Sequence, residues 1–147
     1  MRMVHSSTFG EGASVTTANI KADQIDLMFR AFCDRTRLRI LSLLQGGDLC
    51  VGDIVDSLQE PQPKVSRHLA QLRKAGLVTA RKEGLWNHYS LARPTTEFHR
   101  KLLECAVTCF KDVPEIKSDD SRAKRLRKAG GCCPGKVNKN PRSVYAR

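Results

Sequence analysis

Apolar and polar residues alternate at helical spacing from about residue 20 to residue 111, and one β-hairpin interrupts this pattern. The segment 20–33 predicts a first helix. The second helix, capped by Asp34, is apolar nearly all round and should lie at the centre of the core. A short strand at 48–51 and a third helix at 53–59 follow. The pattern therefore predicts a small, mostly helical domain.

The helix with the clearest start and end signals is predicted over residues 61–77. Pro63 fits its first position, where the missing N–H costs nothing, and Gly76 fits just past its end. One side is an apolar stripe, and the other side carries hydrogen-bond donors without an acid. The apolar stripe is made of Val65, Leu69 and Leu72, and the donors belong to Lys64, Arg67, His68 and Gln71. Taken alone, this helix fits a solvated basic surface helix as well as a DNA-reading one.

The neighbours of this helix favour the DNA-reading interpretation. The third helix, the turn Glu60–Pro63 and the basic helix make a helix-turn-helix. Strands at 77–82 and 85–91 then make a hairpin, which is either a plain β-ribbon or, next to such a helix, a wing. The predicted DNA-binding residues are Gln62, Lys64, Ser66, Arg67, His68, Gln71 and Arg73, with Arg81 and Lys82 of the wing.

A fifth helix is predicted from Pro94 to about Lys111. Its apolar stripe, made of Phe98, Leu102, Cys105 and Cys109, needs a partner surface. A two-fold dimer is the simplest partner, since palindromic DNA sites require one. A short basic helix, capped by Asp119 or Asp120, should end at Gly130–Gly131. His88 and His99 are predicted to be surface or wing-packing residues rather than ligands.

The predicted fold class is α+β, mostly α: a winged helix-turn-helix with about five core helices and a β-hairpin wing. The first and fifth helices should form the homodimer. Residues 1–19 are predicted to be a disordered segment, and residues 20–112 the DNA-binding and dimerisation domain. Residues 113–147 are predicted to be a flexible, basic, cysteine-containing extension.

The net charge of the chain predicts a polyanionic partner. The net charge of the 147-residue chain is +11, which favours nucleic acid, although most of the excess lies beyond Lys117. No apolar run is long enough to span a bilayer and no signal peptide is evident, so a cytoplasmic protein without a membrane partner is expected. The six cysteines would then be reduced thiols.

Several enzyme classes are excluded by what the chain lacks. It has no Cys-x-x-Cys redox motif, no nucleophile–base constellation and no Gly-rich phosphate loop. We therefore expect a protein that is not an enzyme and needs no catalytic cofactor.

Four segments in the right order resemble the ArsR/SmtB winged-helix repressors, and more narrowly their arsenic-responsive members. These segments are 34–41, 48–53, 62–69 and 81–89. The resemblance implies a homodimeric repressor that leaves double-stranded operator DNA when a thiophilic metalloid or metal binds. The arsenic-responsive prototype carries Cys-Val-Cys-x-x-Cys where this chain reads Cys50-Val51-Gly52-Asp53-Ile54-Val55, so two of its three thiols are missing.

The effector site is therefore expected elsewhere. As(III) or Sb(III) needs about three converging thiolates, and soft centres prefer sulfur. The candidate ligands are Cys105 and Cys109, one helical turn apart, and the vicinal pair Cys132-Cys133. Cys33 and Cys50 are predicted to be packing residues. A thiol-redox or Cd/Zn-responsive repressor of the same fold stays open as an alternative, and so does a cytosolic metalloid chaperone.

Overall fold

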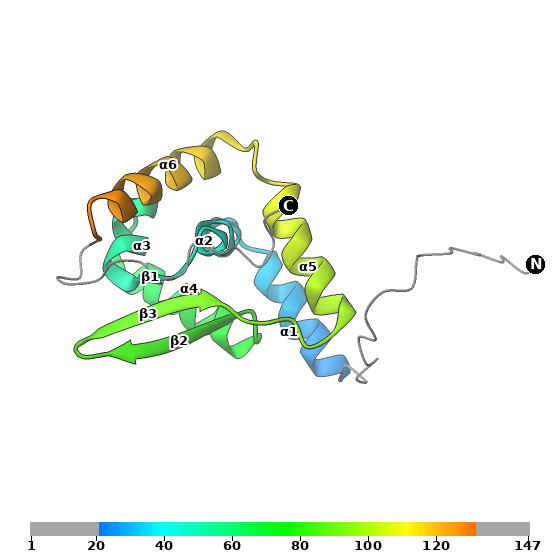
Figure 1. Ribbon diagram of the computed structural model, residues 1–147. Coiled ribbons are helices and arrows are strands. Elements are labelled where there is room, and N and C mark those ends of the chain that lie inside the picture. The colour runs from blue at the N-terminus through cyan, green and yellow to red at the C-terminus, as the bar shows by residue number, and fades with distance from the viewer. Residues whose placement is uncertain (1–20, 132–147) are drawn as a thin grey trace, which may run out of the picture.

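A computed structural model describes residues 21–131, which form six helices and one three-stranded antiparallel sheet (Figure 1). The helices are α1 (Ala22–Phe32), α2 (Arg35–Gln45), α3 (Val51–Leu58), α4 (Gln62–Lys74), α5 (Glu97–Thr108) and α6 (Pro114–Lys128). The strands are β1 (Leu49–Cys50), β2 (Val78–Glu83) and β3 (Trp86–Leu91). The predicted segment 1–19 and the pair Cys132-Cys133 lie outside the described residues.

The helix ends are set by the residues that the sequence indicated. The Asp34 carboxylate accepts the Arg37 N–H at 3.0 Å, so the predicted cap of α2 is confirmed. α4 begins one residue earlier than predicted, with Pro63 at its second position. Gly76 has a φ of +75°, which is the left-handed conformation predicted just past the end of α4.

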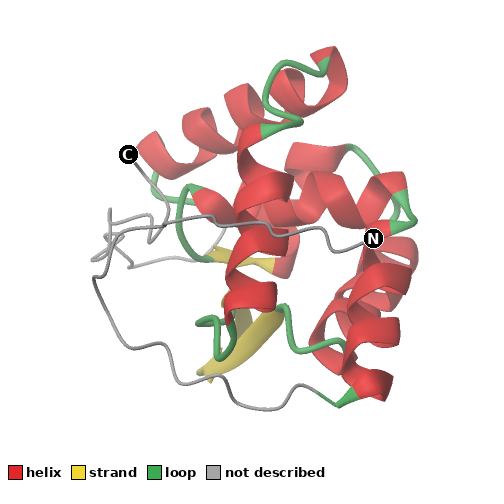
Figure 2. Cartoon of the chain, turned by 90° about the vertical axis from the view of Figure 1, so that its right-hand side faces the viewer, coloured by secondary structure: helices red, strands yellow, loops and turns green. Residues whose placement is uncertain are grey.

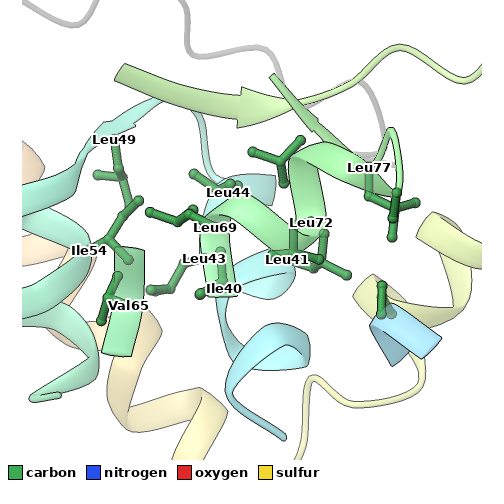
Figure 3. Packing of buried hydrophobic residues seen from close by; sticks show 14 of the residues in the cluster. Ile40, Leu41, Leu43, Leu44, Leu49, Ile54, Val65, Leu69, Leu72 and Leu77 are labelled. Carbon is green, nitrogen blue, oxygen red and sulfur yellow. The ribbon is translucent and has the colours of Figure 1, made fainter. Parts of the chain in front are cut away.

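The core forms around α2, as the all-round apolar pattern predicted. Ile40 and Leu41 are fully buried, and the apolar stripe of α4 packs against this helix (Figure 3). Leu49 of β1 and Ile54 of α3 close one side of the same cluster. The apolar stripe therefore fixes which face of α4 turns inward and leaves its polar face outward.

α3 and α4 form the helix-turn-helix, and the sheet, in the order β1-β3-β2, supplies the wing. Glu83 pairs with Trp86, so Gly84 and Leu85 alone make the turn at the tip. Gly84 has a φ of +61°, which suits the first central position of a two-residue hairpin turn. In Figure 2 the longer strands, β2 and β3, lie in the lower part of the view, beneath the central helix. The predicted winged helix-turn-helix is confirmed.

The last helix differs from the prediction. Asp119 and Asp120 do not cap it, because α6 begins at Pro114 and Asp119 lies mid-helix with 1% of its surface exposed. α6 lies across α2 and reaches α3 (Figure 1), so this part of the predicted extension packs onto the body. α5 is also shorter than predicted and starts after Thr96, whose hydroxyl accepts the His99 N–H. Within residues 21–131, no helix has the length and apolarity to span a membrane.

Candidate nucleic-acid interface and thiol sites

The outer face of α4 is exposed and carries cations that no carboxylate neutralises. Gln62, Ser66, Arg67, Gln71 and Arg73 are all exposed. Arg67 and Arg73 have no ion-pair partner within the described part of the chain. Their guanidinium groups are therefore available to phosphates or base edges.

Two other predicted contacts of this helix are partly engaged. The Lys64 ammonium lies 2.9 Å from the Glu60 carboxylate, and this hydrogen bond holds the pKa of Glu60 below its ordinary value. The Gln71 side-chain carbonyl accepts a hydrogen bond from Arg37. Both side chains are still at the surface, so a phosphate would compete with these partners rather than find a free group.

His68 is placed differently from the rest of the predicted set. Only 12% of its side chain is exposed, and its Nδ1 lies 3.3 Å from Arg37 Nη1 and 3.7 Å from the Asp34 carboxylate. Burial, with help from the neighbouring cations, lowers the pKa of His68 despite the opposing charge of Asp34. The ring is therefore neutral at pH 7 and joins α4 to the start of α2.

Arg37 makes the contacts that hold His68 in this position, and the sequence did not predict this role for it. Its Nε donates to the Ala31 carbonyl at 2.9 Å and its Nη2 donates to the Arg30 carbonyl at 2.8 Å. The same guanidinium reaches Gln71 and His68, so one side chain links the end of α1 to the outer edge of α4. Its position three residues after the Asp34 cap was the only available signal.

The wing carries one cation that is paired with carboxylates and one that has no ion-pair partner among residues 21–131. Arg81 lies 2.8 Å from the Glu83 carboxylate and 3.6 Å from that of Asp48. Lys82 is exposed and has no ion pair with any residue from 21 to 131. Leu85 at the tip is 93% exposed, so the end of the wing is both cationic and apolar.

The two thiols of α5 lie next to each other at its C-terminal end. Cys105 and Cys109 are exposed, and Cys109 is the C-cap residue. A hydrogen bond with the Cys109 thiol is the main cause that raises the pKa of Cys105, and burial adds to it. The pair offers two sulfurs to a soft centre. No group of three or more metal-binding side chains occurs among the described residues, so the described part of the chain does not by itself complete the predicted three-thiol site.

Two further predictions about single residues are wrong. Cys33 is exposed rather than part of the core, whereas Cys50 is buried as predicted. His99 is not at the surface: it is 2% exposed, and its Nε2 has no hydrogen-bond partner in the described region. Burial alone lowers the pKa of His99, so its ring is neutral near pH 7.

α6 is fastened to the helix-turn-helix by buried polar contacts. Arg39 of α2 donates to both carboxylate oxygens of Asp119, at 2.6 and 2.9 Å. Arg39 also lies 3.3 Å from Glu60, at the turn between α3 and α4. Arg122 donates to the Ser57 carbonyl at 2.6 Å. Any displacement of α6 would therefore act directly on α3 and on the turn before α4.

The C-terminal end of α6 is held in the turn between α2 and β1. Arg127 Nη2 donates to the carbonyls of Leu43 and Gly47, at 3.0 and 3.1 Å. A Cβ at Gly46 would lie 2.6 Å from Arg127 Nη1, so the guanidinium occupies the space beside that glycine. Gly131 follows beside α3, where its own Cβ would lie 2.7 Å from the Asp53 carboxylate.

α6 separates the end of α5 from Gly131, the last residue that the structure describes. α5 ends at Thr108, with Cys109 as its C-cap residue, shortly before α6 begins at Pro114, whereas Gly131 follows the other end of α6. A helix of 15 residues is about 22 Å long. Cys132 and Cys133 lie outside the described residues, so the prediction that they join Cys105 or Cys109 in one site stays a prediction.

Comparison with known proteins finds similar transcriptional regulators. Residues 34–80 match the family model described as "Bacterial regulatory protein, arsR family". An uncharacterised helix-turn-helix transcriptional regulator of Methanocaldococcus jannaschii is 57% identical over 63 residues, which cover 42% of this chain and 71% of that protein. The arsenical resistance operon repressor of Escherichia coli is 43% identical over 83 residues, covering 56% of this chain and 71% of that protein.

A solved structure shares the fold. The homodimeric winged helix-turn-helix DNA-binding domain of a Mycobacterium bovis protein superposes with a TM-score of 0.52. The two are 29% identical, and the match covers 62% of this chain and 82% of that one.

Proposed function

Because the chain belongs to the ArsR family of bacterial transcriptional regulators, we propose that it is a repressor that binds operator DNA as a homodimer and is released by As(III) or Sb(III). The observation that carries the DNA-binding part is the exposed face of α4, where Arg67 and Arg73 have no carboxylate partner within residues 21–131. The relative from Escherichia coli, an arsenical resistance operon repressor, supports the effector class.

In the proposed complex α4 enters the major groove and the wing follows the adjacent backbone. Arg67, Arg73 and Ser66 face the DNA from α4, with Gln62, Lys64 and Gln71 at the edges of the contact. Arg81 and Lys82 reach the backbone from the wing. His68 contributes indirectly, because its ring lies next to Asp34 and Arg37 and so helps to position α4.

The proposed dimer seam is formed by α1 and α5. Phe29 of α1 is 51% exposed, and its ring centroid lies 5.4 Å from that of Phe98 on α5. A large exposed aromatic side chain next to an apolar helix face is typical of a surface covered by a second copy. Two α4 helices about 34 Å apart would then fit successive turns of one DNA face.

The effector is proposed to act through cysteine thiolates, since trivalent arsenic and antimony are soft centres. It must bind the form that has left DNA more tightly than the DNA-bound form. A coupling of this kind commonly lowers DNA affinity about 5–150-fold.

Operator binding tests the proposal directly. In a mobility shift on a palindromic site, Arg67→Ala should weaken binding of the full chain strongly, because it removes an unpaired cation from the groove-facing side. Arg125→Ala is the matched control: Arg125 is exposed on α6, away from α4, and its loss should leave binding within about twofold. Equal effects of the two substitutions would contradict the proposed interface, provided circular dichroism shows both variants folded.

Titration with the effector tests the second part of the proposal, which is release from DNA by As(III) or Sb(III). Arsenite or antimonite, added under strictly reducing conditions, should release the full chain from DNA. The contact between Cys105 and Cys109 favours one competing function, a repressor that responds to oxidants. Release by a mild oxidant, with no response to arsenite, cadmium or zinc, would favour that competitor over the metalloid.

A further inference from the structure

A side chain near the start of α1 holds the C-terminal end of α4. The Gln24 Nε2 donates to the carbonyl of Ala75, the C-cap residue of α4, at 2.6 Å. The last carbonyls of a helix have no partner within it, so this hydrogen bond satisfies one of them. A Cβ at Gly76 would lie 3.1 Å from the same Nε2. Gln24 therefore lies close against the turn that ends α4.

Arg37 makes a second connection between α1 and α4. Its guanidinium donates to the carbonyls of Arg30 and Ala31, at the C-terminal end of α1. The same group donates to Gln71 of α4 and lies 3.3 Å from Nδ1 of His68. The N-terminal end of α1 thus holds the end of α4, and the C-terminal end of α1 holds the middle of α4.

Two connections fix a direction that one connection would leave free. His68 precedes Ala75 by seven residues, which is about 10 Å of helix. A single contact would allow α4 to pivot, whereas two contacts this far apart set its angle to α1. Met28 and Ala31 of α1 also belong to the apolar core, but apolar attraction has no preferred direction, whereas hydrogen bonds do. The polar contacts therefore orient α4.

α1 also carries part of the proposed dimer seam. Phe29, which is 51% exposed, lies in the sequence between Gln24 and the carbonyls that Arg37 holds. An α4 that is fixed to α1 is therefore fixed to the seam. In a two-fold dimer, the distance and angle between the two α4 helices then depend on the same contacts.

We infer that Gln24 and Arg37 are positioning residues that set the half-site spacing which the dimer recognises in its operator. This inference rests on the proposed function and on its α1–α5 seam. One added base pair moves a half-site by about 3.4 Å and turns it by about 35° around the DNA axis. A dimer whose α4 helices are held at a fixed angle cannot follow such a change, whereas a dimer with pivoting α4 helices can.

The test measures binding of the full chain to palindromic DNA sites whose half-site separation differs by single base pairs. Gln24→Met keeps the length of the side chain and removes its N–H donors. Arg37→Lys keeps the positive charge and removes the planar guanidinium that reaches α1 and α4 together. The matched control combines Gln45→Met, at the last residue of α2, with Arg125→Lys on the exposed side of α6.

The wild type and the control should prefer one separation over its neighbours by about tenfold or more, and the variant with both substitutions by about threefold or less. The readout is the ratio of affinities, because a loss of stability alone lowers binding to every site by the same factor. Circular dichroism checks that each variant is folded. The two single variants should give intermediate ratios, so they provide the test if the combined variant does not fold.

An unchanged ratio in the folded variants would overturn the positioning role while the repressor function stood. A control whose ratio falls as far as that of the combined variant would do the same, and so would a wild type that binds every separation equally. A wild type that binds palindromic sites no more tightly than unrelated DNA would instead overturn the proposed function, and this inference with it.

Discussion

His99 shows how a single buried residue makes the stability of this protein depend on pH. Its pKa lies below the ordinary 6.5 because burial disfavours the charged ring. Between these two values the unfolded chain binds more protons than the folded one, so stability falls as the pH drops below about 6.5. His68 shifts in the same direction, because it too is buried.

We therefore predict that His99→Leu reduces the loss of stability on acidification. From about pH 7.5 to about pH 5.5, the denaturant midpoint of the wild type should fall more than that of the variant. The variant also removes the Nε2 that has no partner among residues 21–131. Identical losses in the two proteins would mean that the His99 ring is solvated in the folded state.

The sequence predicted which residues of α4 lie inward, but not what its polar edge contacts. Helical spacing placed His68 with Lys64 and Arg67, because all three lie on the side opposite the stripe. Spacing within one helix does not reveal that Arg37 of another helix covers part of that side. For the same reason the burial of His99 and the exposure of Cys33 could not be read from their neighbours in the chain.

At the scale of the elements, α6 depends on its buried ion pair more than on apolar packing. Ile116 and Ala123 are its buried hydrophobic residues, while Asp119 is fully enclosed between Arg39 and Arg122. The hydrogen bond to Asp119 is the main cause that raises the pKa of the Arg39 guanidinium, which therefore stays charged. Breaking a buried pair from one side leaves the other charge uncompensated.

Asp119→Asn should therefore lower the free energy of unfolding by about 3 kcal/mol, since Glu60 and Glu115 still face Arg39. Asp120→Asn, one residue along, breaks the surface pair with Lys124 and removes one negative charge that faces Arg127, so it should cost about 1 kcal/mol or less. Urea unfolding at one fixed protein concentration measures both variants. Similar values for the two would show that α6 does not hold α2 through Asp119.

Elements with strong local signals were predictable, whereas for α6 the sequence predicted a basic helix ending at Gly130–Gly131 but neither its start at Pro114 nor its packing onto α2 and α3. α2 has an Asp cap and an all-round apolar pattern, and the wing has alternating strands around a glycine turn. α6 is mostly charged, and its decisive partner, Arg39, lies far away in the sequence. A pattern of local hydrophobicity therefore predicted a basic extension where the chain packs a helix through polar contacts.

At the scale of the whole molecule, binding to DNA should depend steeply on salt, because each neutralised phosphate releases counterions. The slope of log affinity against log salt is about −0.9 per phosphate contact. If Arg67 contacts a phosphate in both copies of a dimer, Arg67→Ala should reduce the slope by about 1.8, and by only about 0.9 in a monomer.

Titrations between about 50 and 200 mM salt measure this difference. Arg125→Ala, which also removes one positive charge per chain, is the control for net charge and should leave the slope unchanged. A change near 0.9 would contradict two-fold binding even if the affinity fell as predicted.

The turn after α2 and the last helix cannot vary independently. Gly46 has a φ of −72°, which any amino acid adopts easily, so its backbone does not require glycine. The constraint comes from Arg127, whose guanidinium already fills the volume of a methyl group at that position. A homologue that exchanged Arg127 for a shorter side chain would be free to accept alanine at 46, and two positions far apart in the sequence should therefore covary.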